Sequence, residues 1–254
     1  MGKIVAIGGE EIGGLQKDGS VRRIESRQAH EEIINLSGKK HPSVLFIPTA
    51  KNDSQDYIDG FRQYYLGLGC SKVDVLLLVD ERPSKKEIKE KIISADIIYV
   101  NGGNTFRMLK IWKRRHHVER MLKSAYMNGT VMAGHSAGAI CWFSNGNSDS
   151  FNKHHPIKVS ALGLVDALLC PHYDTEPVRQ KALKNMMKRT PRLVGLALDD
   201  ASSIEIVDNK YRIINANETS KARRVYWSKG TYFIEEVKPS ENFQMLDELL
   251  IKPK

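Results

Sequence analysis

Residues 130–141 read TVMAGHSAGAIC, and Ser136 lies inside a Gly-x-Ser-x-Gly pattern. The segment begins as a short β-rich run, passes the two glycines that flank the serine, and continues as an apolar helix. This order is typical of a nucleophile elbow, a sharp turn from strand to helix that exposes the serine hydroxyl. A side chain at Gly134 or Gly138 would collide with the neighbouring chain in such a turn. The pattern also arises by chance, so the interpretation depends on the rest of the chain.

Length and composition indicate an ordinary globular protein. The 254 residues, 41% hydrophobic and 27% charged, suffice for one large domain or two small ones. No run reaches the roughly 18 apolar residues of a membrane span, and the first residues enter a strand without the apolar region of a signal peptide. The three cysteines lack metal-ligand spacing. We therefore predict a cytoplasmic protein with no membrane partner and no metal.

The net charge of +9 raises nucleic-acid binding as a possible function. The basic residues, however, are spread over several predicted helices, where they can form solvated faces. Aromatic residues are not interleaved with them as a stacking platform for bases requires. We expect no nucleic-acid partner, and a mildly basic surface would equally favour acidic substrates.

Apolar, β-branched runs alternate with helical patterns through the first 200 residues. The runs are continuous, as expected of strands covered by helices on both faces. The predicted strands are Lys3–Ile7, Ser43–Pro48, Val73–Leu78, Asp96–Val100, Thr130–Ala133 and Leu193–Ala197, and the predicted helices are 25–37, 54–68, 85–94, 105–115, 117–128 and 175–189. The alternation predicts an α/β fold with a doubly wound, mainly parallel sheet.

The last fifty residues have a different pattern. Two β-hairpins are predicted, followed by an amphipathic helix; the segments are Ser203–Val207 with Tyr211–Ile214, Arg224–Trp227 with Thr231–Val237, and Glu241–Ile251. No linker or internal repeat divides the chain. We predict a single domain, 1–254, with a core of about 1–207 and a β-hairpin-rich C-terminal extension of about 208–254.

A serine nucleophile needs a histidine base and an acid that orients it. His172 is the candidate base, because it follows an apolar run at a predicted strand end, where functional groups gather in α/β sheets. Asp149, just beyond the helix that Ser136 begins, is the favoured acid. Asp199 and Asp200 follow another strand and are its rivals. For all three aspartates, a turn or helix-capping role is the structural alternative.

The developing oxyanion needs backbone N–H donors. Ala137, directly after the serine, supplies one in such elbows. Gly103, in the glycine turn after the strand Asp96–Val100, is the second candidate. Glycine turns also bind phosphate, but this one lacks a dinucleotide fingerprint or a Walker lysine, as does the segment 8–14. His135, adjacent to the serine, is expected to shape a wall of the pocket.

Several segments together resemble the peptidase E-like serine peptidases, a family that includes cyanophycinases. They occur in the family's order and are GGNTF at 102–106, GHSAGA at 134–139, NSDS at 147–150, LLCPHY at 168–173 and GLALDDA at 195–201. The resemblance implies a class I glutamine-amidotransferase-like fold. It implies Ser136 as nucleophile, His172 as base and Asp149 as orienting acid, with Gly103 and Ala137 as oxyanion donors. Asp200 is the alternative acid, since the family often has glutamate there.

The same resemblance implies a serine exopeptidase of dipeptidase or aminopeptidase type, with Asp-X dipeptides among its candidate substrates. Arg179, Asn104 and His135 are the candidate substrate-binding residues, Arg179 because a basic group would have to hold an aspartyl carboxylate. The expected partner is a small peptide, no cofactor is expected, and a homodimer is left open. The alternatives are a cyanophycinase-like or esterase-type serine hydrolase, or an inactive binding protein of the same fold.

Overall fold

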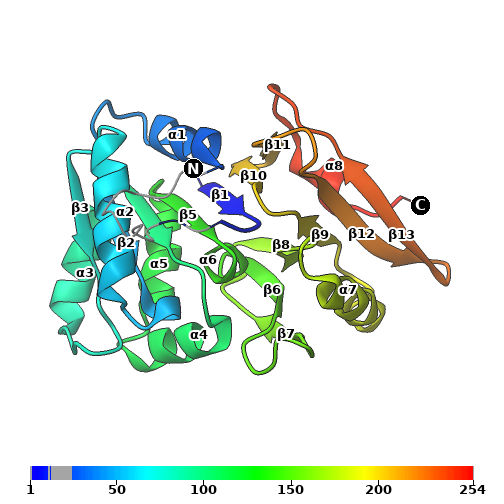
Figure 1. The fold of residues 1–254 in the computed structure, drawn as a ribbon, viewed down its shortest axis with the longest axis horizontal. Helices are drawn as coiled ribbons and strands as arrows, with labels where there is room; N and C mark the ends of the chain where they lie inside the picture. The colour runs from blue at the N-terminus through cyan, green and yellow to red at the C-terminus, as the bar shows by residue number, and fades with distance from the viewer. Residues whose placement is uncertain (1, 11, 13–24, 254) are drawn as a thin grey trace.

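Two β-sheets organise the part of the chain that the computed structural model describes, residues 2–10, 12 and 25–253 (Figure 1). The first sheet has eight strands in the order β14-β11-β10-β1-β5-β4-β2-β3. Its central strands β1, β5, β4, β2 and β3 run parallel, and β10 pairs antiparallel with β1. The strands are β1 Lys3–Ile7, β2 Ser43–Ile47, β3 Lys72–Val75, β4 Ile97–Val100, β5 Val131–His135, β10 Ser202–Val207, β11 Lys210–Asn215 and β14 Gln244–Met245.

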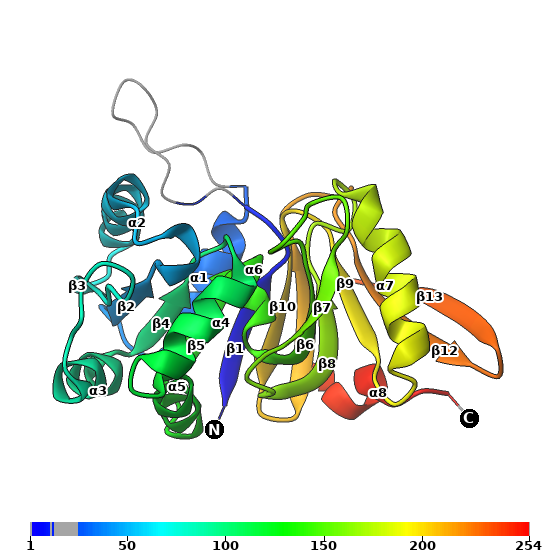
Figure 2. The same cartoon turned by 90° about the horizontal axis from the view of Figure 1, so that it is seen from below.

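Helices cover both faces of this first sheet (Figure 2). On one face, α1 and α2 bury apolar side chains such as Ile33 and Phe61 against the strands. On the other face, α3, α4 and α5 contribute Ile92, Trp112 and Leu122 to a larger core. The helices are α1 Arg27–Leu36, α2 Gln55–Gly67, α3 Lys85–Ser94, α4 Thr105–Arg114 and α5 Val118–Met127, and a short 3-10 helix, η1, spans Thr49–Lys51.

Local sequence explains where these helices begin. Ser84 and Glu87 form a reciprocal capping box at the start of α3. At the start of α4, the side chain of Asn104 accepts a hydrogen bond from the Arg107 amide at 2.9 Å. This second cap fixes the start of the helix that follows the glycine turn.

The second sheet has six strands in the order β13-β12-β9-β8-β6-β7, and β6, β8 and β9 run parallel. One face shares the larger core with the first sheet through the short helix α6, and α7 packs on the other face through Leu183 and Met187. The elements are α6 Ala137–Ile140, β6 Phe143–Ser148, β7 Ile157–Ser160, β8 Val165–Cys170, α7 Pro177–Arg189, β9 Gly195–Leu198, β12 Ala222–Ser228, β13 Thr231–Val237 and α8 Leu246–Leu250.

The α/β class, the mainly parallel first sheet and both C-terminal hairpins are as predicted. Two segment predictions are wrong. The chain after Ser136 forms one helical turn and then β6, because β6 pairs with β8 and is buried between neighbours. The last predicted helix is shortened to Leu246–Leu250, since Gln244–Met245 pairs with β11. The division into core and extension and the amidotransferase-like fold remain predictions.

None of the helices in the described part of the chain is long and apolar enough to cross a membrane.

Candidate active site

The carboxyl ends of parallel strands from both sheets meet at one place. Ser136 directly follows β5, His172 follows β8 by one residue, and Asp200 follows β9 by one residue. The glycine turn after β4 and the Gly8–Glu10 segment after β1 lie at the same edge. Functional groups of α/β proteins gather at this edge because the loops that leave parallel strands converge there.

Ser136 has the backbone geometry of a nucleophile elbow. Its φ is +51°, a region that a non-glycine residue occupies only when its surroundings hold it there. A Cβ on Gly134 would lie 2.6 Å from the carbonyl oxygen of Val100, and a Cβ on Gly138 would lie even closer to that oxygen. The predicted need for both glycines is confirmed: only their bare backbones let β4 and α6 pack this tightly.

A row of hydrogen bonds connects Ser136, His172 and Asp200. His172 Nδ1 lies 2.6 Å from Asp200 Oδ1, and His172 Nε2 lies 2.9 Å from Ser136 Oγ. Because an ionised carboxylate only accepts, Nδ1 carries the proton and Nε2 is free to accept the serine hydroxyl. The imidazole therefore has the orientation and the tautomer that a base for Ser136 requires.

The pKa of Asp200 favours its ionised form. Burial by itself raises this pKa, but the contacts with His172 and the hydrogen bond from Thr175 Oγ1 at 2.9 Å outweigh burial and lower it. The backbone amide of Asp200 in turn donates to Asp174 at 2.9 Å. The carboxylate is thus held in place from several sides while it accepts from His172.

Asp149, the acid favoured from the sequence, does not lie against the histidine in the structure. Its Oδ1 lies 3.2 Å from Arg179 NH2. Asp199 is also engaged elsewhere, in a two-point ion pair with Arg223. The physical reason is the unpredicted strand β6, which carries Asp149 to the buried Arg179 rather than back to the serine. Of the three aspartates considered, Asp200 is the one that contacts His172.

Two backbone amides beside Ser136 are available to a ligand. Within the described chain, the amides of Gly103 and Ala137 donate no hydrogen bond to the protein. Ala137 begins α6, where the first N–H groups have no partner inside the helix. Gly103 has a φ of +137°, and a Cβ there would collide with the carbonyl of Ala50. Both predicted oxyanion donors thus have N–H groups near Ser136 that no described residue accepts from.

The site opens into a cleft of about 370 Å³. All three predicted substrate-binding residues line it, but their polar groups are already bonded within the protein. The Asn104 amide group donates to the Ser150 carbonyl at 2.8 Å, and both His135 ring nitrogens are engaged. Arg179, only 2% exposed, bonds the Asn147 carbonyl and pairs with Asp149 and Glu176.

Sequence reasoning missed several residues of the cleft. Lys51 and Tyr57 belong to it, with the Lys51 ammonium 4.7 Å from the centre of the Tyr57 ring. Glu176 and Glu10 also line it. The sequence held one usable signal, since Gly8–Glu10 directly follows the first strand of a parallel sheet. The sequence pattern of segment 8–14 indicates only a weak phosphate loop. Its residues 11, 13 and 14 lie outside the residues that the structure describes.

Gly9 approaches the His172–Asp200 pair so closely that a Cβ would overlap Asp200 Oδ1 and His172 Nδ1. We predict that Gly9→Ala separates these two groups and lowers kcat by about 100-fold, since small misplacements in a catalytic array have effects of this size. Steady-state kinetics on a cleaved peptide measure the loss. Gly67→Ala is the matched control, because a Cβ there meets no atom within 4 Å; equal activities of the two variants would contradict the prediction.

His135 is buried beside Ser136, and burial lowers its pKa to about 4. Between about pH 6.5 and pH 4, His135 is protonated in the unfolded chain and neutral in the folded chain. The free energy of unfolding therefore decreases as the pH falls through this range. We predict that His135→Gln makes the slope of the unfolding free energy against pH smaller by about 1.4 kcal/mol per pH unit in this range. Urea unfolding at several pH values measures it, with the exposed His154→Gln as control. An unchanged slope in His135→Gln would contradict a neutral His135.

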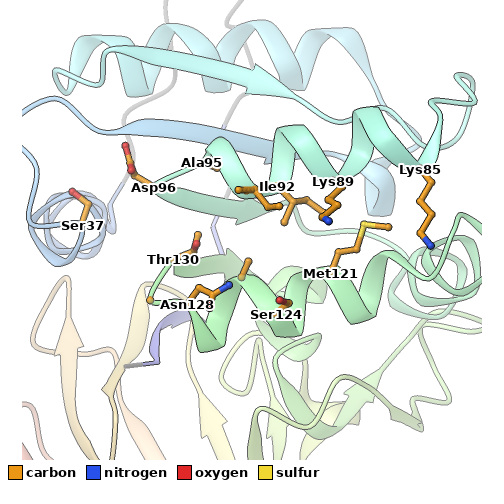
Figure 3. A pocket seen from close by; sticks show the side chains of 13 residues that line it. Ser37, Lys85, Lys89, Ile92, Ala95, Asp96, Met121, Ser124, Asn128 and Thr130 are labelled. Atoms are coloured by element: carbon orange, nitrogen blue, oxygen red, sulfur yellow. The ribbon is translucent and has the colours of Figure 1, made fainter.

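A second hollow, of about 500 Å³, lies between α3 and α5 (Figure 3). Asp96 and Thr130, which line it, precede β4 and β5, so it lies at the amino ends of strands whose carboxyl ends carry the glycine turn and Ser136. Neither histidine nor cysteine occurs among its described lining residues. The cleft at Ser136 is therefore the candidate active site.

The α/β fold and a serine–histidine–aspartate row at the strand ends are features of a hydrolase. Residues 18–214 match the model of peptidase family S51, and the chain belongs to this family. An uncharacterized peptidase, YgaJ, of Bacillus subtilis (strain 168) is 33% identical over 89% of this chain and 92% of its own. Peptidase E of Nostoc sp. (strain PCC 7120 / SAG 25.82 / UTEX 2576) is 26% identical over 86% and 88%. The crystal structure of a peptidase from an acI-B1 Actinobacterium has the same fold, with a TM-score of 0.69, 16% identity and 96% of both chains covered.

Proposed function

We propose that this chain is a serine exopeptidase that hydrolyses short peptides from the N-terminal end. The observation that carries the proposal is the row of Ser136, His172 and Asp200, with contacts of 2.9 and 2.6 Å, at the mouth of a cleft. Membership of a peptidase family supports the same reaction class.

In this proposal, the Ser136 hydroxyl attacks the scissile carbonyl carbon while His172 Nε2 takes its proton. The Gly103 and Ala137 amides donate to the oxygen that becomes negative, and Asp200 stabilises the imidazolium. The imidazolium then protonates the leaving amine as the C–N bond breaks. Water, deprotonated by His172, next attacks the acyl-enzyme, which releases the acid product and restores Ser136.

The charges of the cleft favour a substrate with free termini. Asp149 and Glu176 both pair with Arg179, so this cluster of three charges is net negative, and the two carboxylates are about one-third exposed. We propose that they receive the α-ammonium group of a peptide. Lys51, whose ammonium contacts the Tyr57 ring, is the proposed partner for a substrate carboxylate.

Selection of Asp-X substrates by Arg179 would require this buried guanidinium to give up a partner it already has. An uncompensated buried charge is costly, so we do not propose Arg179 as the residue that selects an acidic side chain. The cleft should therefore accept Ala-X as well as Asp-X dipeptides.

A dipeptide panel tests this substrate class. We predict that Ala-Leu and Asp-Leu are both cleaved, and that acetylating the N-terminus of Ala-Leu lowers kcat/KM by about 10- to 100-fold through loss of a charge-assisted contact. Lys51→Met should raise the KM for both free dipeptides. Product formation measured by chromatography gives these constants. Equal cleavage of acetylated and free Ala-Leu would contradict the exopeptidase proposal, and cleavage of Asp-Leu alone would contradict the broader specificity.

A further inference from the structure

Behind the cleft, buried hydrogen bonds join the glycine turn to the end of the first strand. The Gly102 amide lies 3.0 Å from His135 Nε2 and also 3.0 Å from the side-chain oxygen of the preceding Asn101. His135 Nδ1 lies 3.0 Å from the Tyr99 hydroxyl. The Tyr99 hydroxyl lies 2.5 Å from Glu10 Oε1. These contacts form one continuous path from a loop beside the nucleophile to a carboxylate.

The chemistry of each group gives this path a single direction. A backbone N–H can only donate, so His135 Nε2 must be unprotonated to accept from Gly102. The proton of the neutral ring is then on Nδ1, which donates to Tyr99. The tyrosine oxygen accepts that bond, and its own hydrogen points to Glu10. Every group has a partner of the matching kind.

Glu10 is suited to end the path as an anion. Its carboxylate is 4% exposed and also contacts His30 Nε2 at 3.0 Å and the Ser26 hydroxyl. Burial raises its pKa, but these contacts and the nearby His135 outweigh burial and lower the pKa to about 2. An ionised carboxylate only accepts hydrogen bonds, so the Tyr99 hydroxyl that faces it must be the donor.

The path bears on catalysis through the glycine turn. Gly102 is buried, and a Cβ there would lie 2.6 Å from His135 Nε2 and 3.3 Å from the Ser136 Cβ. Next to it, Gly103 packs tightly against Ala50 of η1. The turn is thus held by His135 at one residue and by η1 at the next. Its shape decides where the free Gly103 amide points.

We propose that Glu10, Tyr99 and His135 form a positioning relay that holds the glycine turn so that the Gly103 amide can receive the oxyanion. The inference rests on the proposed function. A second proton on His135 would place an N–H against the Gly102 N–H and break the relay. Among the described residues, the charged or titratable groups around His135 are Glu10 after β1, His30 on α1, Lys51 on η1, Tyr99 on β4 and His172 after β8.

The tautomer of His135 tests the relay without any measurement of activity. Nitrogen-15 NMR of histidine-labelled protein, with the His135 signals assigned by comparison with His135→Gln, should show a neutral ring protonated at Nδ1 at pH 7. In Tyr99→Phe the Nδ1 resonance should shift, because its acceptor is gone. A ring protonated at Nε2, or at both nitrogens, at pH 7 would overturn the proposal.

Two matched pairs of variants test the effect on catalysis. His135→Gln keeps a side-chain acceptor at position 135 for the Gly102 amide, whereas the similarly shaped His135→Met leaves that amide only its contact with Asn101 Oδ1. Tyr99→Phe removes a hydroxyl of the relay, whereas Tyr226→Phe removes a buried tyrosine hydroxyl of the second sheet that also donates to a glutamate, Glu235, at 2.6 Å. We expect His135→Met and Tyr99→Phe to lower kcat by about 10- to 100-fold with little change in KM. His135→Gln should recover most of the loss, and Tyr226→Phe should keep the wild-type kcat.

The outcomes separate the relay from the proposed function. If the wild-type protein cleaves the dipeptides but His135→Met and Tyr99→Phe keep its kcat, the relay is wrong and the peptidase proposal stands. If His135→Gln is as slow as His135→Met, the Gly102 contact is not what His135 supplies, and the relay is again overturned. If the wild-type protein cleaves nothing, the proposed function fails and the NMR result alone decides the relay. Thermal unfolding of each variant identifies losses that come from misfolding.

Discussion

Ser136→Ala is expected to lower kcat by about 10⁴-fold or more while the protein stays folded, because removing a triad nucleophile has effects of this size. The change deletes one oxygen at a partly exposed position and leaves the backbone of the elbow in place. His172 and Asp200 keep their mutual contact. The loss should therefore appear in kcat, measured on the cleaved dipeptide, with the unfolding midpoint within a few degrees of wild type.

A covalent probe gives an independent test of the proposed nucleophile. Diisopropyl fluorophosphate should label the wild-type protein at Ser136, as mass spectrometry of its peptides would show, and should not label Ser136→Ala. Ser144→Ala is the matched control, since the Ser144 hydroxyl bonds Asp166 on the second sheet and lies outside the cleft. Activity that survives in Ser136→Ala, or labelling at another serine, would refute the assignment.

Asp200→Asn is expected to lower kcat by about 10²- to 10⁴-fold, whereas Asp149→Asn should lower it by less than about 10-fold. If the asparagine amide donates to His172 Nδ1, the ring proton moves to Nε2. A protonated Nε2 can no longer accept the hydrogen bond from the Ser136 hydroxyl. Asp149, in contrast, contacts Arg179, which keeps Glu176 as a partner. The two substitutions are chemically identical, so each is the control for the other in steady-state kinetics.

The two candidate acids can be told apart by whether substitution to asparagine changes kcat or KM. If Asp149 receives the substrate ammonium as proposed, Asp149→Asn should mainly raise KM. If the kcat loss is large in Asp149→Asn and small in Asp200→Asn, the acid favoured from the sequence is correct and the contact seen at His172 is not the functional one.

Most elements of the first sheet could be predicted because their signals are local. Helices such as Lys85–Ser94 are marked by caps and apolar periodicity, and buried strands such as Lys3–Ile7 by continuous apolar runs. The strand Phe143–Ser148 has no such signal, because its sequence, FSNGNS, is mostly polar. It is a strand because β7 and β8 pair with it on both sides. Tertiary pairing overrides weak local propensity there.

The elbow around Ser136 and the histidine at the end of its strand were predictable for the same local reason. The choice of acid was not, because three aspartates each follow a strand or a turn and look alike in the sequence. Their roles differ through partners distant in the chain: Arg179 for Asp149, Arg223 for Asp199 and His172 for Asp200.

The sequence by itself determined the α/β class and the serine elbow with its two obligatory glycines. These properties depend on residues close together in the sequence, because steric exclusion and apolar periodicity act over a few residues. Only the tertiary structure decided which carboxylate faces His172, that Arg179 is already paired, and that His135 joins Gly102 to Tyr99 and Glu10. Hydrogen bonds and ion pairs act over a few ångströms, so they depend on how the two sheets meet.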